Sequence, residues 1–191
     1  MIKKASTQIV EFWIKNAIIK TDDKESYCYG MELILSTLIN VAFMVILSYY
    51  VIGYPIAFIP YIAVYTPLRL TAGGYHARSH LKCILYTQIT FIVFVMSALA
   101  LAKKNIWCLI VLYMVAVLTV LRLAPVEAEN KPLTGEEKHK QQLNTWEFQT
   151  IILIVIVIAA IFGVLKNKIV LCVMAANISV AISLILAKII D

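Results

Sequence analysis

The chain has 191 residues, of which 62% are hydrophobic and 15% are charged, and its formal net charge is +6. A soluble globular domain is nearer about 45–50% apolar and about 25% charged, so this chain has too few charges to cover a water-exposed surface. The composition excludes an ordinary soluble domain and a disordered chain, and it indicates an integral membrane protein.

The N-terminal segment, residues 1–30, is predicted to be amphipathic. Its apolar residues recur at helical spacing with charged residues between them; they are Ile2, Ala5, Ile9, Phe12 and Trp13. Such a helix lies either on the inner leaflet, where its lysines meet anionic lipid, or on the protein's own cytoplasmic face. Both positions use one apolar stripe, so the sequence leaves them open.

Six apolar segments follow. A helix needs roughly 20 apolar residues to cross a bilayer, so the length of each segment decides whether it can span the membrane. They are residues 33–52, 53–67, 84–102, 106–123, 151–165 and 169–187. The second is short and contains three prolines, so the count of six requires that it crosses the membrane. We therefore predict an all-α, polytopic membrane helix bundle of about six spans, which forms a single integral-membrane domain over residues 1–191.

Charged residues support this organisation and predict its orientation. No carboxylate occurs from Leu33 to Val126, which fits a membrane interior and excludes paired-carboxylate hydrolase chemistry there. With the N-terminus in the cytoplasm, 13 of the 17 Lys and Arg residues lie inside, in agreement with the positive-inside rule. Two polar stretches, residues 69–83 and 122–148, then form cytoplasmic loops long enough to hold a site.

The first loop carries the candidate chemistry, because His76, His80 and Cys83 lie within eight residues. A nearby histidine can take the proton of a cysteine thiol and so create a thiolate nucleophile. His76 and Cys83 are roughly 10 Å apart along a continuous helix, so the pair requires a non-helical loop before a helix start near Cys83. Gly73 and Gly74 supply the backbone freedom for such a turn.

Two other interpretations stay open. On a continuous helix, His76, His80 and Cys83 would share one face and could bind zinc, although no carboxylate lies nearby to act as a base. Six spans would also suit a small transporter or peptide exporter, although no acidic residue lies within a span to couple ions. We predict no metal, no other cofactor and no nucleic-acid partner.

The chain resembles the accessory gene regulator protein B family, the integral-membrane cysteine endopeptidases of Gram-positive peptide quorum sensing. The resemblance rests on Arg69, on the Gly-Gly-Tyr-His sequence at 73–76 and on Cys83, between the second and third spans. Residues 124–133 resemble a second segment of that family. Size, span count and basic character agree, so the resemblance covers nearly the whole chain.

The resemblance implies a peptidase that removes the C-terminal tail of a quorum-sensing precursor peptide. Cys83 would be the nucleophile that keeps the remaining peptide as an acyl-enzyme thioester, and His76 would be the general base. Arg69, Gly73 and Gly74 would support them. An internal Cys or Ser of the peptide would then displace the enzyme and close a thiolactone or lactone. The protein would lie in the cell membrane of a Gram-positive bacterium.

The resemblance also implies a precursor with an amphipathic leader and an acidic C-terminal tail. A basic cytoplasmic side suits both anionic lipid and such a peptide. Six further residues are expected to contact the substrate or to assist the catalytic pair: Arg78, Lys82, Gln88, Glu127, Glu129 and Asn130. We expect Arg69 to contact the tail together with Arg78 and Lys82, and Gln88 to donate to an oxyanion or to orient His76. A homodimer is compatible with so small a bundle.

Overall fold

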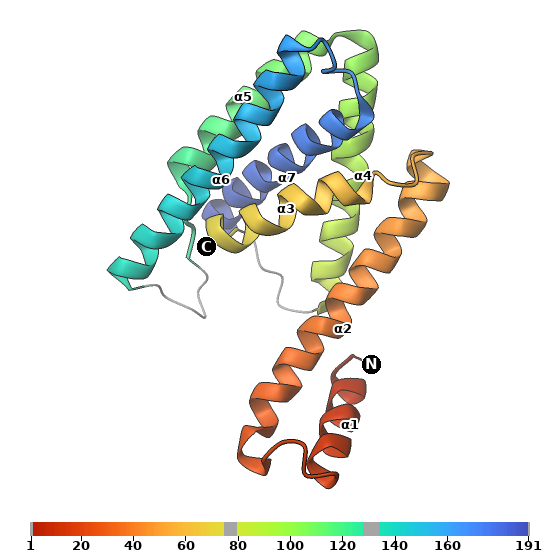
Figure 1. Ribbon diagram of the computed structural model, residues 1–191, viewed down its shortest axis with the longest axis vertical. Helices are drawn as coiled ribbons and strands as arrows, with labels where there is room; N and C mark the ends of the chain where they lie inside the picture. The colour runs from red at the N-terminus through yellow and green to blue at the C-terminus, as the bar shows by residue number, and fades with distance from the viewer. Residues whose placement is uncertain (1, 75–79, 128–133, 191) are drawn as a thin grey trace.

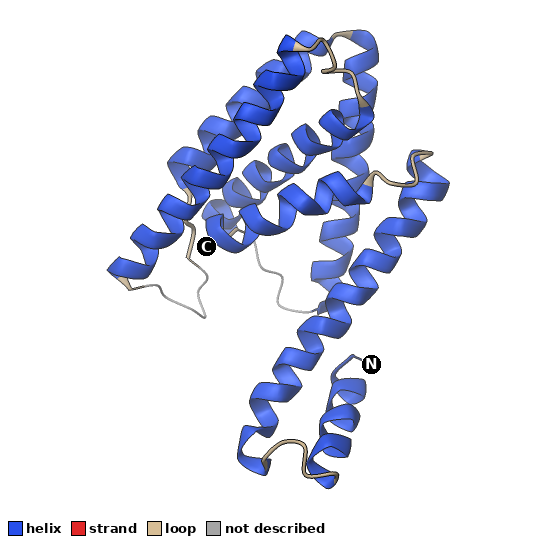
Figure 2. Ribbon diagram, viewed as in Figure 1, coloured by secondary structure: helices blue, strands red, loops and turns tan. Residues whose placement is uncertain are grey.

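The computed structural model describes residues 2–74, 80–127 and 134–190, which are almost entirely helical (Figure 2). The helices in these ranges are α1 (Ile2–Lys15), α2 (Lys24–Leu47), α3 (Phe58–Ala72), α4 (His80–Lys104), α5 (Ile106–Leu123), α6 (Gly135–Ile161) and α7 (Lys168–Ile190). A short 3₁₀ turn (Thr21–Asp23) precedes α2, and a π turn (Ser48–Ile52) continues it. The predicted all-α, polytopic helix bundle is confirmed.

The centre of the bundle is α7, and α3, α4 and α5 pack around it (Figure 1). Ala175, Ala176, Val180 and Leu184 of α7 are completely buried. The small side chains among them, Ala175 and Ala176, allow neighbouring helix backbones to approach closely, which is how helices associate when lipid removes the hydrophobic driving force. By contrast, α2 is largely unburied and reaches away from the bundle (Figure 1).

Five stretches within the described residues are long and apolar enough to cross a membrane, and they correspond to α2, α4, α5, α6 and α7. The remaining predicted span, the second in chain order, corresponds to α3, and its predicted bounds of 53–67 are wrong by about five residues. Gly53 closes the π turn that follows α2, and Pro67 is accommodated inside α3. With 15 residues, α3 is about 22 Å long, shorter than a hydrocarbon core of about 30 Å.

Both predicted cytoplasmic loops are shorter than expected, because helices extend into them. The last residues of α3 and the first of α4 occupy the two ends of residues 69–83. Most of residues 122–148 is helical, because α6 begins at Gly135 with a capping box. The Glu137 backbone N–H donates to Thr134 Oγ1 at 3.3 Å, and the Thr134 N–H donates to Glu137 Oε2 at 2.9 Å. These bonds satisfy backbone donors at the helix start and fix where α6 begins.

The amphipathic N-terminal helix packs on the protein itself. Ser6 and Val10 of α1 are buried, α1 lies against α2, and Lys24 Nζ contacts Glu11 Oε1 at 3.0 Å. Helix α1 contacts the protein's own surface, as one of the two predicted positions requires, while Phe12 is 61% exposed and the predicted position on the inner leaflet stays a prediction. The predicted segment of 30 residues is divided, since its last seven residues already belong to α2.

Candidate active site

A tight turn at the end of α3 places the first candidate residues. Gly73 has φ +76° and Gly74 has φ +123°, a region of backbone conformation that residues with a side chain rarely adopt. Arg69, one turn earlier, folds back and donates from Nη1 to the Gly73 carbonyl at 2.6 Å. The guanidinium therefore holds the carbonyl that follows the helix. The two glycines have the unusual backbone conformation that the sequence led us to expect, while the predicted turn that returns His76 toward Cys83 lies outside the described residues.

Space as well as backbone conformation requires glycine here. A β-carbon at Gly73 would overlap the carbonyl oxygen of Val126. A β-carbon at Gly74 would overlap the Arg69 guanidinium and lie 2.9 Å from the Ser183 hydroxyl of α7. The turn is therefore enclosed by a neighbouring loop on one side and by the central helix on the other.

The neighbouring loop is the second segment that the sequence singled out. The Val126 backbone N–H donates to the Ala72 carbonyl at 2.9 Å, and Gly73 and Val126 pair as an isolated parallel β-bridge. We refer to Arg69, Ala72, Gly73, Gly74, Val126 and Ser183 as the loop junction. It joins two segments that are far apart in the sequence, so residues 69–74 and 124–127 form one region of the molecule.

Cys83 lies in the first turn of α4, as the fourth residue of that helix, and it is partly buried. Its carbonyl accepts a hydrogen bond from Thr87 Oγ1 at 2.9 Å. Tyr65 of α3 is buried and lies one turn before Arg69 on the same helix. The predicted helix start near Cys83 is confirmed, whereas His76 and Arg78 lie outside the described residues, so the Cys–His and zinc geometries stay predictions.

Gln88 lies one turn beyond Cys83 on α4 and faces α2. Its Nε2 donates to Asn40 Oδ1 at 2.8 Å and to the Asn40 carbonyl at 3.1 Å. The amide nitrogen is thus engaged in a contact between helices, which leaves the predicted role as an oxyanion donor or orienter without support from this arrangement. Lys82, also predicted to contact substrate, is exposed at the start of α4.

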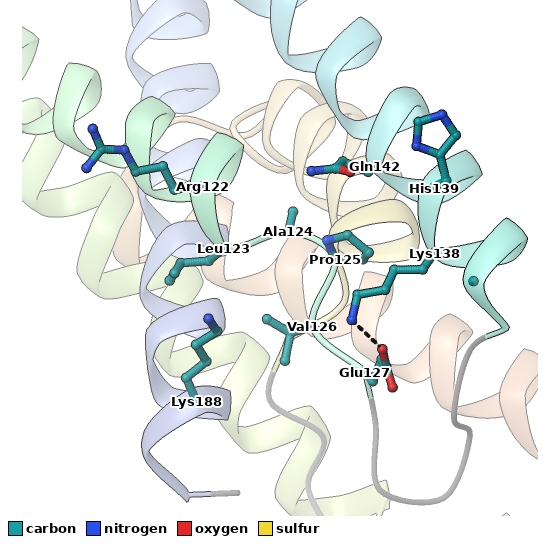
Figure 3. A pocket seen from close by; sticks show the side chains of 11 residues that line it. Arg122, Leu123, Ala124, Pro125, Val126, Glu127, Lys138, His139, Gln142 and Lys188 are labelled. Atoms are coloured by element: carbon teal, nitrogen blue, oxygen red, sulfur yellow. Dashed lines mark hydrogen bonds and ion pairs between the residues drawn. The ribbon is translucent and has the colours of Figure 1, made fainter.

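Glu127 lies beside the loop junction and pairs with a residue of α6. Lys138 Nζ approaches Glu127 Oε1 at 2.7 Å, and both line a pocket between the ends of α5 and α7 and the start of α6 (Figure 3). The other two residues predicted with Glu127, namely Glu129 and Asn130, lie outside the described residues.

Sequence reasoning missed three residues that shape this region, namely Tyr65, Val126 and Ser183. A signal was available for Ser183, because Asn177, Ser179 and Ser183 are polar residues in an otherwise apolar helix, and such residues usually face the interior of a membrane bundle. For Tyr65 and Val126 nothing in the residue type distinguishes them, and only the tertiary contacts reveal their positions.

Comparison with known proteins supports the family resemblance that rests on Arg69, on residues 73–76 and on Cys83. The family described as accessory gene regulator B matches residues 6–186, a range that includes both loops. A similar relative is AgrB-like protein 2 of Clostridium perfringens (strain 13 / Type A), which is 30% identical over 149 residues that cover 74% of this chain and 68% of the relative. No solved structure matches the chain. The chain therefore belongs to the accessory gene regulator B family, which takes part in quorum-sensing peptide processing.

Proposed function

We propose that this protein is a membrane cysteine endopeptidase that removes the C-terminal tail of a quorum-sensing precursor peptide and promotes its cyclisation. The observation that carries the proposal is the position of Cys83, partly buried in the first turn of α4 and following a loop whose entry is fixed by the loop junction. The N-terminal end of a helix favours a negative charge, which suits a thiolate nucleophile.

The proposed reaction has two steps. In the first, His76 takes the proton of the Cys83 thiol, and the thiolate attacks the carbonyl carbon of the scissile peptide bond. The C–N bond breaks, the leaving amine of the tail takes a proton from His76, and a thioester joins the peptide to Cys83. In the second, an internal thiol or hydroxyl of the peptide loses its proton and attacks the thioester, and the Cys83 sulfur leaves with a proton. The product is a thiolactone or a lactone.

The loop junction supports this chemistry by fixing the start of the loop that carries His76. Arg69 donates to the Gly73 carbonyl, so we assign it a positioning role rather than the tail contact expected from sequence. The second loop holds the same turn through the Val126–Ala72 hydrogen bond. A fixed loop reduces the conformational freedom that the catalytic pair must lose before reaction.

Membrane location suits the second step of the reaction. Water hydrolyses a thioester irreversibly, whereas attack by an internal nucleophile of the bound peptide closes the ring. Positioning that nucleophile beside the thioester can lower the barrier by about 7–11 kcal/mol. We expect the precursor to lie on the inner leaflet through its amphipathic leader, with the N-terminus and both loops of the enzyme in the cytoplasm and anionic lipid at its basic surface.

Co-expression with the precursor tests the proposal. Mass spectrometry of the peptide should show tail release by the wild type and none by Cys83→Ala or His76→Ala. The matched control is Cys108→Ala, which removes an exposed cysteine of α5 and should cut normally. Undiminished cleavage by Cys83→Ala would contradict the proposal.

A second experiment tests the acyl-enzyme. A precursor whose internal nucleophile is replaced by Ala should still lose its tail but cannot close a ring, so the enzyme should accumulate a covalent adduct. Intact-protein mass spectrometry should find the adduct on wild type and on Cys108→Ala, and hydroxylamine should release it. Tail release that survives thiol alkylation but stops on zinc chelation would favour a metal enzyme instead.

A further inference from the structure

Two cations lie at the ends of neighbouring helices that are long and apolar enough to span a membrane. Arg122 is in the last turn of α5 and Lys188 is in the last turn of α7, and these two helices pack against each other. Both side chains line an open pocket of about 700 Å³. Figure 3 shows them on the side of the pocket formed by α5 and α7, opposite Lys138 and His139 of α6. One side of the pocket therefore presents two cations where both helices end.

Neither of these two cations has a carboxylate partner among the residues that the structure describes. The pocket lining contains one carboxylate, that of Glu127, and Lys138 Nζ already contacts its Oε1 at 2.7 Å. The ion pairs found within the described ranges include neither Arg122 nor Lys188. A concave surface focuses the field of such uncompensated charges and raises the local concentration of an anion.

Both cations lie at the depth expected for lipid headgroups. Lys168 and Lys188 enclose an uncharged stretch of α7 that is about 30 Å long, which equals the thickness of a hydrocarbon core. Helix α5 is about 27 Å long, and its one charged residue is Arg122 in the last turn. Trp146 of α6, a residue type that favours the membrane interface, donates from Nε1 to the Leu121 carbonyl at 3.3 Å, directly beside Arg122. The phosphates of one leaflet are therefore expected at the level of the two cations.

An exposed apolar surface leads along the helices to each cation. On α5, Val115 and Leu118 are exposed and precede Arg122 at helical spacing, so all three side chains lie on one face. On α7, Ile185 is exposed one turn before Lys188. An acyl chain that lies along these residues would bring its phosphate to the two cations. A hydrophilic peptide or a free anion would leave this surface unused, so the combination favours a lipid.

We propose that Arg122 and Lys188 bind the phosphate of one anionic phospholipid whose acyl chain lies along α5. A guanidinium suits this ligand, because its planar N–H groups match two phosphate oxygens. General attraction between basic residues and anionic lipid needs no defined site, whereas the pocket, the two cations and the apolar face together define one. The bound lipid holds the ends of two helices that carry the loop junction, since Val126 follows α5 and Ser183 belongs to α7. The inference is independent of the proposed function, because binding is measured without a precursor.

Native mass spectrometry of the wild-type protein in neutral detergent tests the site. The probes are phosphatidylglycerol and phosphatidylcholine with identical acyl chains, which share the phosphate and differ in net charge. Phosphatidylglycerol should form a 1:1 complex with an affinity about tenfold higher than that of phosphatidylcholine. Combined replacement Arg122→Gln and Lys188→Gln should weaken phosphatidylglycerol binding by about tenfold. The matched control is Lys103→Gln with Lys104→Gln, which removes two cations from the last turn of another helix, α4, and should bind the lipid like the wild type.

Thermal unfolding of the wild-type protein gives a second measurement that needs no variant. Phosphatidylglycerol should raise the Tm more than phosphatidylcholine does, and water-soluble glycerol phosphate should leave it unchanged because it lacks an acyl chain. An equal rise with glycerol phosphate would assign the pocket to a free phosphate and overturn the proposal. Equal phosphatidylglycerol affinity in the Arg122 and Lys188 double variant and in the control would also overturn it. The same holds if an Asp- and Glu-rich peptide, and not the lipid, binds in a way that depends on these two cations.

Discussion

Replacing Gly73 with alanine should open the loop junction. An alanine at φ +76° costs about 1–2 kcal/mol because its β-carbon meets the backbone. At this position the β-carbon also overlaps the Val126 carbonyl, so the second loop has to move away and the Val126–Ala72 hydrogen bond is lost. That bond contributes about 0.5–1.5 kcal/mol. The combined cost of about 1.5–3.5 kcal/mol should raise the population of the open junction roughly 10- to 400-fold.

Hydrogen exchange measured by mass spectrometry reports this opening directly. The Val126 amide should exchange about tenfold faster or more in Gly73→Ala, and tail release should fall with it. The matched control is Gly163→Ala, since Gly163 also has a positive φ of +68° but nothing lies within 4 Å of its β-carbon position. That variant carries the backbone strain without the collision and should leave Val126 protected. Equal exchange at Val126 in the two variants would refute the reasoning about the junction.

Three further predictions concern side chains on other elements. Arg69→Gln removes a charge-assisted hydrogen bond to the turn, so thermal unfolding in detergent should show a loss of about 1.5–3 kcal/mol and cleavage should drop, with Arg69→Lys recovering part of it. A hydrogen bond from Lys24 lowers the pKa of the Glu11 carboxyl. Protease protection of α1 should therefore weaken as pH falls below 4.5, and Glu11→Gln should abolish this acid step. Asn177 Nδ2 donates to Gln149 Oε1 at 2.8 Å inside the bundle, and a double-mutant cycle with leucine should give a coupling of about 1 kcal/mol, whereas additive effects would contradict it.

The helices predicted correctly from the sequence are those that can be recognised from the length of an apolar segment alone. Residues 106–123 were assigned without error, and the last span differs only by a few residues at its ends. The prediction failed where polar residues form helix, because composition assigns them to loops. The start of α6 at Gly135 results from a capping box and from helix-forming Glu, Lys and Gln, which are local effects rather than effects of hydropathy.

Only part of the candidate site was predicted, because a sequence shows residue types but not which backbone groups come into contact. Residue types with special chemistry or conformation, such as Cys83 and the two glycines, are visible in a sequence. Contacts between distant backbone groups are not, because a peptide N–H and a carbonyl are present at every residue. The pairing of Val126 with Gly73 depends on such groups, and so the sequence indicated that both loops matter without indicating that they meet.

The loop junction also makes the site a property of the assembled bundle. Arg69 comes from α3, Val126 from the loop after α5, and Ser183 from the buried centre of α7. A displacement of α7 by one residue would rotate its side chains by about 100° and remove the Ser183 hydroxyl from Gly74. Polar pairs deep in the bundle, such as Asn177 with Gln149, resist such a displacement because a shifted amide would lose its partner in a nonpolar environment. Residues in the interior of the bundle can therefore control the geometry of the loop junction.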